Sequence, residues 1–188
     1  MTLLPITLIG DKILRKKATR VTEVDMKTIE LIKNMFDTMR NASGIGLAAN
    51  QVGSDKSIIV VDISGVEDYE EFKPLVLINP KIISRSEDVS VFEEGCLSIP
   101  DIRADVERPE SITLTYNDTD LKEITLEADD LLARVVQHEY DHLQGIEFIQ
   151  KVSDYSKIIV KEHYRKNIRN SPLQKKNSLI TKIEYKTI

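Results

Sequence analysis

The chain has 188 residues, a net charge of −5 and a single cysteine, with 41% hydrophobic and 30% charged residues. That length is enough for one domain with its own core, and the composition is ordinary for a soluble globular protein. No apolar run reaches membrane-spanning length, and the first residues lack the features of a signal peptide. One cysteine cannot form an intramolecular disulfide, which fits a reducing compartment. We therefore expect a cytoplasmic protein without membrane contact.

An amphipathic helix is predicted near the N-terminus, over residues 25–42. Its apolar side chains recur at helical spacing, Asp25 is a suitable N-cap, and the pattern ends at residues 41–44. Residues 44–53 then read Gly-Ile-Gly-Leu-Ala-Ala-Asn-Gln-Val-Gly. Glycines and small residues let backbone amides face a ligand closely, and Gln51 offers a neutral donor that can polarise a carbonyl group. Alone, this segment is a weak functional signal.

The middle of the chain changes from helical to strand periodicity. Apolar runs rich in β-branched residues, or alternating apolar and polar residues, predict strands at 57–62, 75–79, 89–93, 102–107, 111–117 and 121–126. Residues 117–120 supply the turn of a hairpin between the last two strands. We therefore expect an α+β domain, with mixed or antiparallel sheets packed around a central helix and with further helices near both ends of the chain.

That central helix is predicted over residues 129–144, with Gly145 as its C-terminal cap, and it contains an HExxH motif. Residues four apart share a helix face, so His138 and His142 can point their imidazoles at one metal ion. Glu139 lies close enough to hold a proton beside a metal-activated water. Two histidines can fall four apart by chance, but this pair sits inside an amphipathic helix. The motif therefore predicts metal-assisted hydrolysis.

The C-terminal part is basic. A helix is predicted over residues 154–168, and residues 179–185 alternate, so they either form an edge strand or stay loose. Residues 157–188 contain nine Lys or Arg against two Glu, about +7, which leaves about −12 for the first 156 residues. This region is either a docking patch for an anionic partner such as RNA or a solvated face; we expect no DNA binding. We divide the chain into one catalytic domain over residues 1–170 and a tail over 171–188.

Three residues compete to be the third metal ligand. Glu162 lies twenty residues after His142, a spacing that resembles thermolysin-like metallopeptidases, and His163 is its neighbour. Cys96 lies upstream, just after a predicted strand. A lone cysteine is usually a small core residue, but Gly95 permits close approach here, whereas the alternating charges around Glu162 are typical of a solvated face. We therefore favour Cys96. A Cys-His-His site holds three protein ligands and keeps a fourth position open for water, which indicates a catalytic site and not a structural one.

Together, three segments resemble the peptide deformylase family. The family carries GφGφAAxQ, EGCφS and QHExDH in this order, and this chain has matching residues at 44–51, 94–98 and 137–142. Residues 11–15 also look like the family's N-terminal segment. The resemblance covers residues 8–150 approximately. It implies removal of the N-formyl group from N-formylmethionyl nascent peptides, with release of formate.

The resemblance also implies a role for individual residues of the metal centre. Cys96, His138 and His142 match the metal ligands, and Glu139 matches the general acid and base. The family resemblance implies Fe²⁺ as the cellular metal, and such a ligand set also accepts Zn²⁺, Ni²⁺ or Co²⁺. Since deformylases act on chains leaving the ribosome, the basic C-terminal helix could dock there.

Other residues match the family's substrate contacts. Gln51 and the backbone N–H of Leu97 match the groups that hold the formyl oxygen. The positions expected to bind the substrate backbone or to lie near the methionine pocket are Ile45, Gly46, Glu94, Leu97, Arg134 and Val135.

Two residues depart from the family. Asn50 and Lys12 replace common prolines; the first predicts a looser loop around Gln51, and the second lies in a segment expected to be remote from the chemistry.

Two rival functions remain open from sequence alone. One is a zinc metallopeptidase that cuts internal peptide bonds with Glu162 as its third ligand. The other is a metal-bearing binding protein that docks through the basic C-terminal helix, for example onto ribosomal RNA.

Overall fold

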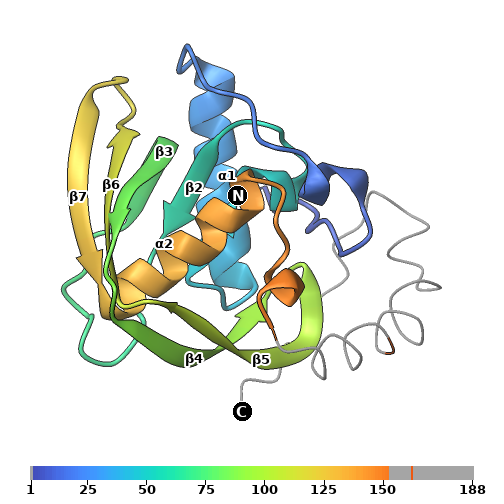
Figure 1. Cartoon of the computed structure of the whole chain (residues 1–188). Coiled ribbons are helices and arrows are strands. Elements are labelled where there is room, and N and C mark those ends of the chain that lie inside the picture. Colours follow the sequence, from blue (N-terminus) through green and yellow to red (C-terminus); the bar gives the residue numbers. More distant parts are fainter. Residues whose placement is uncertain (1, 153–161, 163–188) are drawn as a thin grey trace.

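The computed structural model describes residues 2–152 and residue 162, and it places two antiparallel sheets around a central helix, α2 (Asp130–Leu143) (Figure 1). The strands of the larger sheet, in spatial order, are β1 (Gly46–Ala48), β2 (Ile58–Val61), β3 (Leu75–Arg85), β6 (Ser111–Asn117) and β7 (Glu123–Asp129). The smaller sheet pairs β4 (Val89–Cys96) with β5 (Ile99–Pro109). Short 3-10 turns lie at η1 (Lys12–Arg15), η2 (Ala49–Val52) and η3 (Phe148–Gln150). The α+β prediction is confirmed.

The N-terminal helix α1 (Met26–Asn41) begins at its predicted cap. The Asp25 carboxylate accepts hydrogen bonds from the Thr28 backbone N–H at 2.8 Å and from the Thr28 hydroxyl at 2.6 Å. These bonds satisfy donors that the first helical turn leaves unpaired. The apolar stripe of α1, which includes Met35 and Met39, is buried against the sheet.

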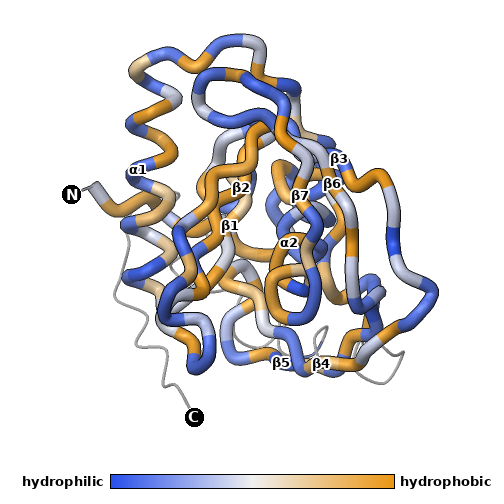
Figure 2. The backbone as a smooth tube through the Cα atoms, turned by 90° about the vertical axis from the view of Figure 1, so that its left-hand side faces the viewer, coloured by the Kyte–Doolittle hydropathy of each residue, from blue (hydrophilic) through white to orange (hydrophobic). Residues whose placement is uncertain are grey.

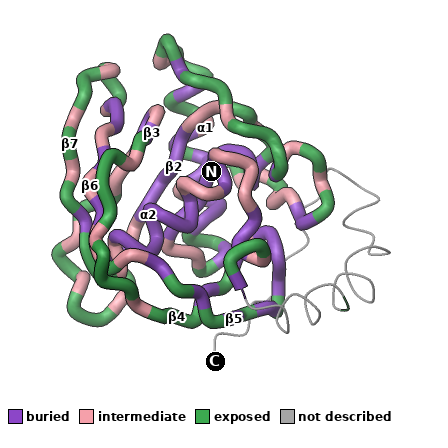
Figure 3. Tube along the Cα trace, viewed as in Figure 1, coloured by how far each residue is buried: buried purple, intermediate pink, exposed green. Residues whose placement is uncertain are grey.

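Strand β2 explains how both helices share one sheet. Its four residues are all fully buried. Ile58 and Val60 pack with α1, whereas Ile59 and Val61 pack with α2, as expected when alternate side chains point to opposite faces. The tube through β2 is hydrophobic in Figure 2, and Figure 3 shows β2 and most of α2 as the buried centre of the molecule. A strand covered on both faces reads as a continuous apolar run, as residues 58–61 do.

Several strands differ in length from the prediction. Strands β3, β4 and β5 are longer than the apolar segments that predicted them. The ladder of β3 continues to the exposed residues Ser84 and Arg85, whereas β4 and β5 extend over buried residues that include Glu94 and Arg108. Strand β1 was not predicted; its glycine-rich segment was expected only to turn backbone amides towards a ligand. It pairs Leu47 with Val60 of β2 and forms one edge of the larger sheet.

Helix α2 ends as predicted. Gly145 has a φ of +74°, and its N–H donates to the carbonyl of His142 at 3.0 Å. A Cβ atom at this position would lie 2.6 Å from the Arg15 carbonyl oxygen, so η1 packs directly against the end of α2. The motif helix is therefore fixed at its C-terminal end by the N-terminal segment.

The predicted C-terminal helix over 154–168, the alternating segment over 179–185 and the boundary near 170 lie outside the described residues, apart from Glu162. Among the residues that the structure describes, no helix combines the length and apolarity needed to cross a membrane.

Candidate metal centre and active site

Three buried side chains from two elements converge on one point. Cys96 ends β4, while His138 and His142 lie one turn apart on α2; one ligand atom from each falls within 4.8 Å of the other two. The Cys96 Sγ and His142 Nε2 atoms are 3.2 Å apart. Among residues 2–152 and 162, this is the one group of three such side chains. Glu162 is exposed and outside it, and His163 is not described.

The electrostatics of this group suit a cation. Burial disfavours protonation of His138, but hydrogen bonds to Cys96 and Glu94 raise its pKa to about 10. Burial and the charge on His138 lower the pKa of His142 well below its usual value. The pocket thus attracts one positive charge between a thiol and two imidazoles. A divalent transition metal, which binds thiolate and neutral imidazole, fits this donor set.

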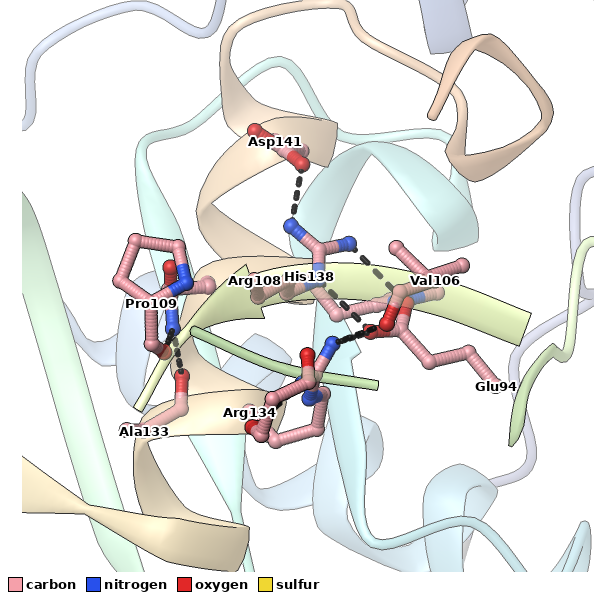
Figure 4. Close-up of polar contacts among 10 residues, drawn as sticks. Glu94, Val106, Arg108, Pro109, Ala133, Arg134, His138 and Asp141 are labelled. Atoms are coloured by element: carbon pink, nitrogen blue, oxygen red, sulfur yellow. Dashed lines mark hydrogen bonds and ion pairs between the residues drawn. The ribbon is translucent and has the colours of Figure 1, made fainter. Parts of the chain in front are cut away.

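Glu94 controls the orientation of His138. Its Oε2 lies 2.9 Å from His138 Nδ1 (Figure 4). A proton on Nδ1, donated to this carboxylate, leaves Nε2 free to bind a metal, the usual arrangement for a ligating histidine.

The Glu94 carboxylate is the centre of a buried ion-pair network. Arg108 donates to its Oε1 at 2.7 Å and its Oε2 at 3.0 Å, and Arg134 donates to Oε1 at 2.9 Å. Arg108 also donates to Asp141 of α2 at 2.7 Å. Burial would raise the pKa of Glu94, but the hydrogen bonds from His138 and Arg108 lower it well below its usual range. Glu94 therefore stays ionised at neutral pH.

Arg134 joins α2 to the smaller sheet. It also donates to the Val106 carbonyl at 2.9 Å and to the Ser90 carbonyl at 2.9 Å, and its guanidinium lies 5.0 Å from the Phe92 ring centroid. Gln137, one turn further along α2, donates to the Pro109 carbonyl at 2.9 Å (Figure 4). The Arg134 guanidinium thus bonds to groups of the protein itself, and substrate contact by Glu94 or Arg134 stays a prediction.

Glu139 has the opposite environment to Glu94. It is buried, and its Oε2 has no hydrogen-bond partner among the described residues. Burial raises its pKa to about 7, although the charge on His138 acts against this. Gly46 of β1 lies directly against it: a Cβ there would be 2.7 Å from Glu139 Oε1 and 2.7 Å from Val135 Cγ1. Only glycine leaves room for this carboxylate.

The amide of Gln51 is held in one orientation. The backbone N–H of Ala48 donates to Gln51 Oε1 at 2.8 Å. Because Oε1 accepts this bond, Nε2 is the atom that faces Cys96 Sγ at 3.6 Å and Ser98 Oγ at 3.3 Å. Gln51 thus presents a neutral donor beside the three candidate ligands.

Asn50 ties this loop to the motif helix instead of loosening it. The side chain is buried, and its Nδ2 donates to the His142 carbonyl at 2.6 Å. A proline here would fix the backbone but could not make this bond. The loop of Gln51 and the end of α2 are therefore directly connected.

Leu97 and Ile45 lie in the two segments that flank the candidate ligands, the turn after β4 and the residues before β1. Cys96 pairs with Ile99, so Leu97 and Ser98 form the two-residue turn between β4 and β5. The Leu97 side chain faces Gly44, where a Cβ would lie 2.8 Å from its Cδ1. Ile45 precedes β1, and its carbonyl accepts from Asp62 at 2.9 Å. The predicted site residues thus lie on β1 and the residue before it, on η2, on the end of β4 and the turn that follows it, and on α2.

Sequence reasoning did not identify Arg108, Asp141 or Ser98. A signal for Arg108 was present, since residues 102, 104, 106 and 108 alternate with exposed neighbours on β5 and are all buried. An arginine on the buried face of a strand requires a buried anion. Asp141 and Ser98 fall on fixed positions of the quoted patterns QHExDH and EGCφS, but the patterns alone assigned neither residue a role.

The chain is similar to known proteins of one family. The family described as polypeptide deformylase matches residues 3–157. The chain is 43% identical to a peptide deformylase of Agrobacterium fabrum over 90% of this chain and 98% of that one, and 51% identical to one of Chlorobium phaeobacteroides over 80% of each. Among solved structures, it is similar to a peptide deformylase of Synechococcus elongatus in complex with actinonin (TM-score 0.77, 44% identity, 87% and 85% covered). It also resembles the Ehrlichia chaffeensis peptide deformylase (TM-score 0.81, 35% identity, 89% and 98% covered).

The two adjacent glutamates of β4 provide a matched test of the network. Glu94→Gln leaves two buried arginines without their shared anion, so we expect a loss of about 3–5 kcal/mol in the free energy of unfolding and metal binding weaker by about 10–100-fold. Glu93→Gln removes a pair with Arg103 in which both side chains are more than half exposed, and should change stability by less than about 0.5 kcal/mol. Denaturant unfolding and metal titration measure both. Equal effects of the two substitutions would contradict a special role for the buried carboxylate.

Proposed function

The chain belongs to the polypeptide deformylase family, and we propose that Cys96, His138 and His142 hold its catalytic metal while Glu139, Gln51 and the Leu97 backbone act on the formyl group. The enzyme removes the N-formyl group from the N-terminal formylmethionine of newly synthesised polypeptides and releases formate. The observation that carries the proposal is the convergence of three ligand atoms within 4.8 Å beside a buried carboxylate whose Oε2 has no hydrogen-bond partner among the described residues.

Glu139 moves the proton in this reaction. When bound, a divalent metal supplies Lewis acidity, which makes water a stronger nucleophile near neutral pH and polarises the formyl carbonyl. Glu139 accepts a proton from the water that attacks the formyl carbon. It then gives the proton to the amine nitrogen as the C–N bond breaks, leaving formate and a free N-terminus. A pKa raised to about 7 suits a group that must both accept and donate a proton.

Gln51 and Leu97 stabilise the negative charge that develops on the formyl oxygen. Gln51 Nε2 is a neutral donor whose orientation is fixed by Ala48, and the Leu97 N–H belongs to the turn that follows the Cys96 ligand. Donors that are already oriented need little reorganisation as the charge forms, which favours the transition state over the substrate.

The substrate backbone is proposed to lie along Ile45, Gly46 and Leu97, with Val135 beside the methionine side chain. Strand β1 supports this placement, because it is an edge strand and next to Glu139. Glu94 and Arg134 contribute by fixing the end of β4 against α2.

The assay that decides this proposal is formate release from a short N-formylmethionyl peptide by the metal-loaded enzyme. Glu139→Gln and Cys96→Ala should abolish turnover, and Gln51→Ala should lower kcat about a hundredfold or more through loss of one oxyanion donor. Glu162→Ala, at an exposed position outside the ligand group, should retain activity. Cleavage of internal bonds that depends on Glu162, with no formate released, would support the metallopeptidase instead.

We propose Fe²⁺ as the physiological metal, with Zn²⁺, Ni²⁺ or Co²⁺ able to replace it at one site per chain. A thiolate ligand with imidazoles accepts each of these ions. The Fe²⁺ enzyme should lose activity in air with oxidation of Cys96, detected as a mass increase, because a thiolate that loses its metal is open to oxidation. The Ni²⁺ enzyme, as a control, should keep its activity over the same time. Identical rates of loss with the two metals would contradict this assignment.

We further propose that residues 1–170 form the catalytic domain and that the enzyme works in the cytoplasm. The basic region 157–188 is proposed to dock the enzyme to the ribosome. The charge of about +7 in that region supports contact with RNA. Cosedimentation with ribosomes should therefore weaken steeply as salt is raised and be lost when the basic residues are replaced by glutamine. Unchanged cosedimentation would remove the docking proposal without affecting the catalytic one.

A further inference from the structure

Residues 4–9, here called the N-terminal strap, connect the two loops that carry the oxyanion donors. The backbone N–H of Thr7 donates to the Gln51 carbonyl at 2.7 Å. Two residues later, the backbone N–H of Ile9 donates to the Ser98 carbonyl at 2.9 Å. The neighbouring segment around Lys12 was expected to be remote from the chemistry. The backbone of the strap nevertheless donates hydrogen bonds to residues on both sides of the site.

The acceptors belong to the residues that position the two donors. Gln51 carries the first donor on its side chain, and its backbone carbonyl is the group that accepts the hydrogen bond from Thr7. Ser98 follows Leu97, whose N–H is the second donor, in the same two-residue turn. Two residues of backbone span at most about 7 Å. The strap therefore limits how far η2 and the turn after Cys96 can separate.

The strap is itself anchored at both ends, so it can restrain the loops. At its start, the Leu4 N–H donates to Thr38 Oγ1 of α1 at 2.9 Å. At its end, Leu8 and Ile9 are buried in one apolar cluster with Cys96 and Phe148. Beyond it, η1 packs against the end of α2 at Gly145.

We propose that the N-terminal strap is a positioning element for the deformylase reaction: it keeps Gln51 Nε2 and the Leu97 N–H at the separation at which both donate to the formyl oxygen. The inference rests on the proposed function of these two donors. A displacement of about 1 Å at such a site can cost a hundredfold in rate. A strap that only filled the core would lower stability without acting through Gln51.

Proline substitution removes one backbone donor at a time. Thr7→Pro deletes the bond to the Gln51 carbonyl. Ile6→Pro is the matched control, because the Ile6 N–H donates to no described group and Pro5 already precedes it. We expect Thr7→Pro to lower kcat by about tenfold or more while KM and metal content stay unchanged, and Ile6→Pro to resemble the wild-type enzyme.

A double-mutant cycle separates positioning from general damage. In a Gln51→Ala background the donor is already absent, so adding Thr7→Pro should lower kcat by less than about twofold further. A full tenfold loss in both backgrounds, an equal loss with Ile6→Pro, or an unchanged kcat for Thr7→Pro would each overturn the proposal.

A second variant keeps the test decisive if Thr7→Pro does not fold. Thr38→Val removes the acceptor for Leu4 without altering the strap, and should give a smaller fall in kcat that also disappears in the Gln51→Ala background. Additive losses for Thr38→Val would overturn the proposal. If the wild-type enzyme released no formate, the proposed function itself would fail, which is distinct from an active enzyme that tolerates Thr7→Pro.

Discussion

The arrangement of this site depends on one buried carboxylate, that of Glu94. It accepts hydrogen bonds from two arginines and lies against the His138 ring, and so joins the smaller sheet to the motif helix. Replacing a buried ion pair by apolar residues often costs little, so a network of this kind need not add much net stability. Its effect is on geometry. The β4–β5 pair cannot slide along α2 without leaving a charge unpaired in the interior, and Cys96 therefore stays opposite the histidines.

The two buried glutamates of the site show how environment assigns roles to identical groups. Glu94 is surrounded by cationic donors, and these keep it ionised in spite of burial. Glu139 lies where burial dominates, beside a glycine and without a hydrogen-bond partner for Oε2 among the described residues, and its pKa rises to about 7. One carboxylate serves as a permanent anion and the other as a group that exchanges protons, which is the division expected where catalysis needs both.

Local patterns predicted helices α1 and α2, most strands and the HExxH face, because each depends on side chains close in the sequence. The choice of Cys96 as the third candidate ligand also came from local sequence, since Gly95 permits close approach and the charges around Glu162 are typical of a solvated face. The contacts that could not be predicted join residues far apart in the sequence. Arg108 finds its anion across a strand pair, Asn50 bonds to a carbonyl 92 residues away, and the strap meets loops from two distant segments. Strand β1 was missed because three small or apolar residues carry no alternation, and only pairing with β2 defines them.

Asn50 has a consequence for how the Gln51 loop responds to local opening of the protein. A proline would stiffen the loop covalently, largely by restricting the unfolded chain, and this restriction persists whatever neighbouring elements do. The bond from Asn50 exists only while the last turn of α2 is formed, because that turn supplies its acceptor. Fraying of the helix end therefore removes one of the bonds that hold the loop and leaves the bond from Thr7 to the Gln51 carbonyl, so the order of the Gln51 loop is partly coupled to that of the turn that carries His142.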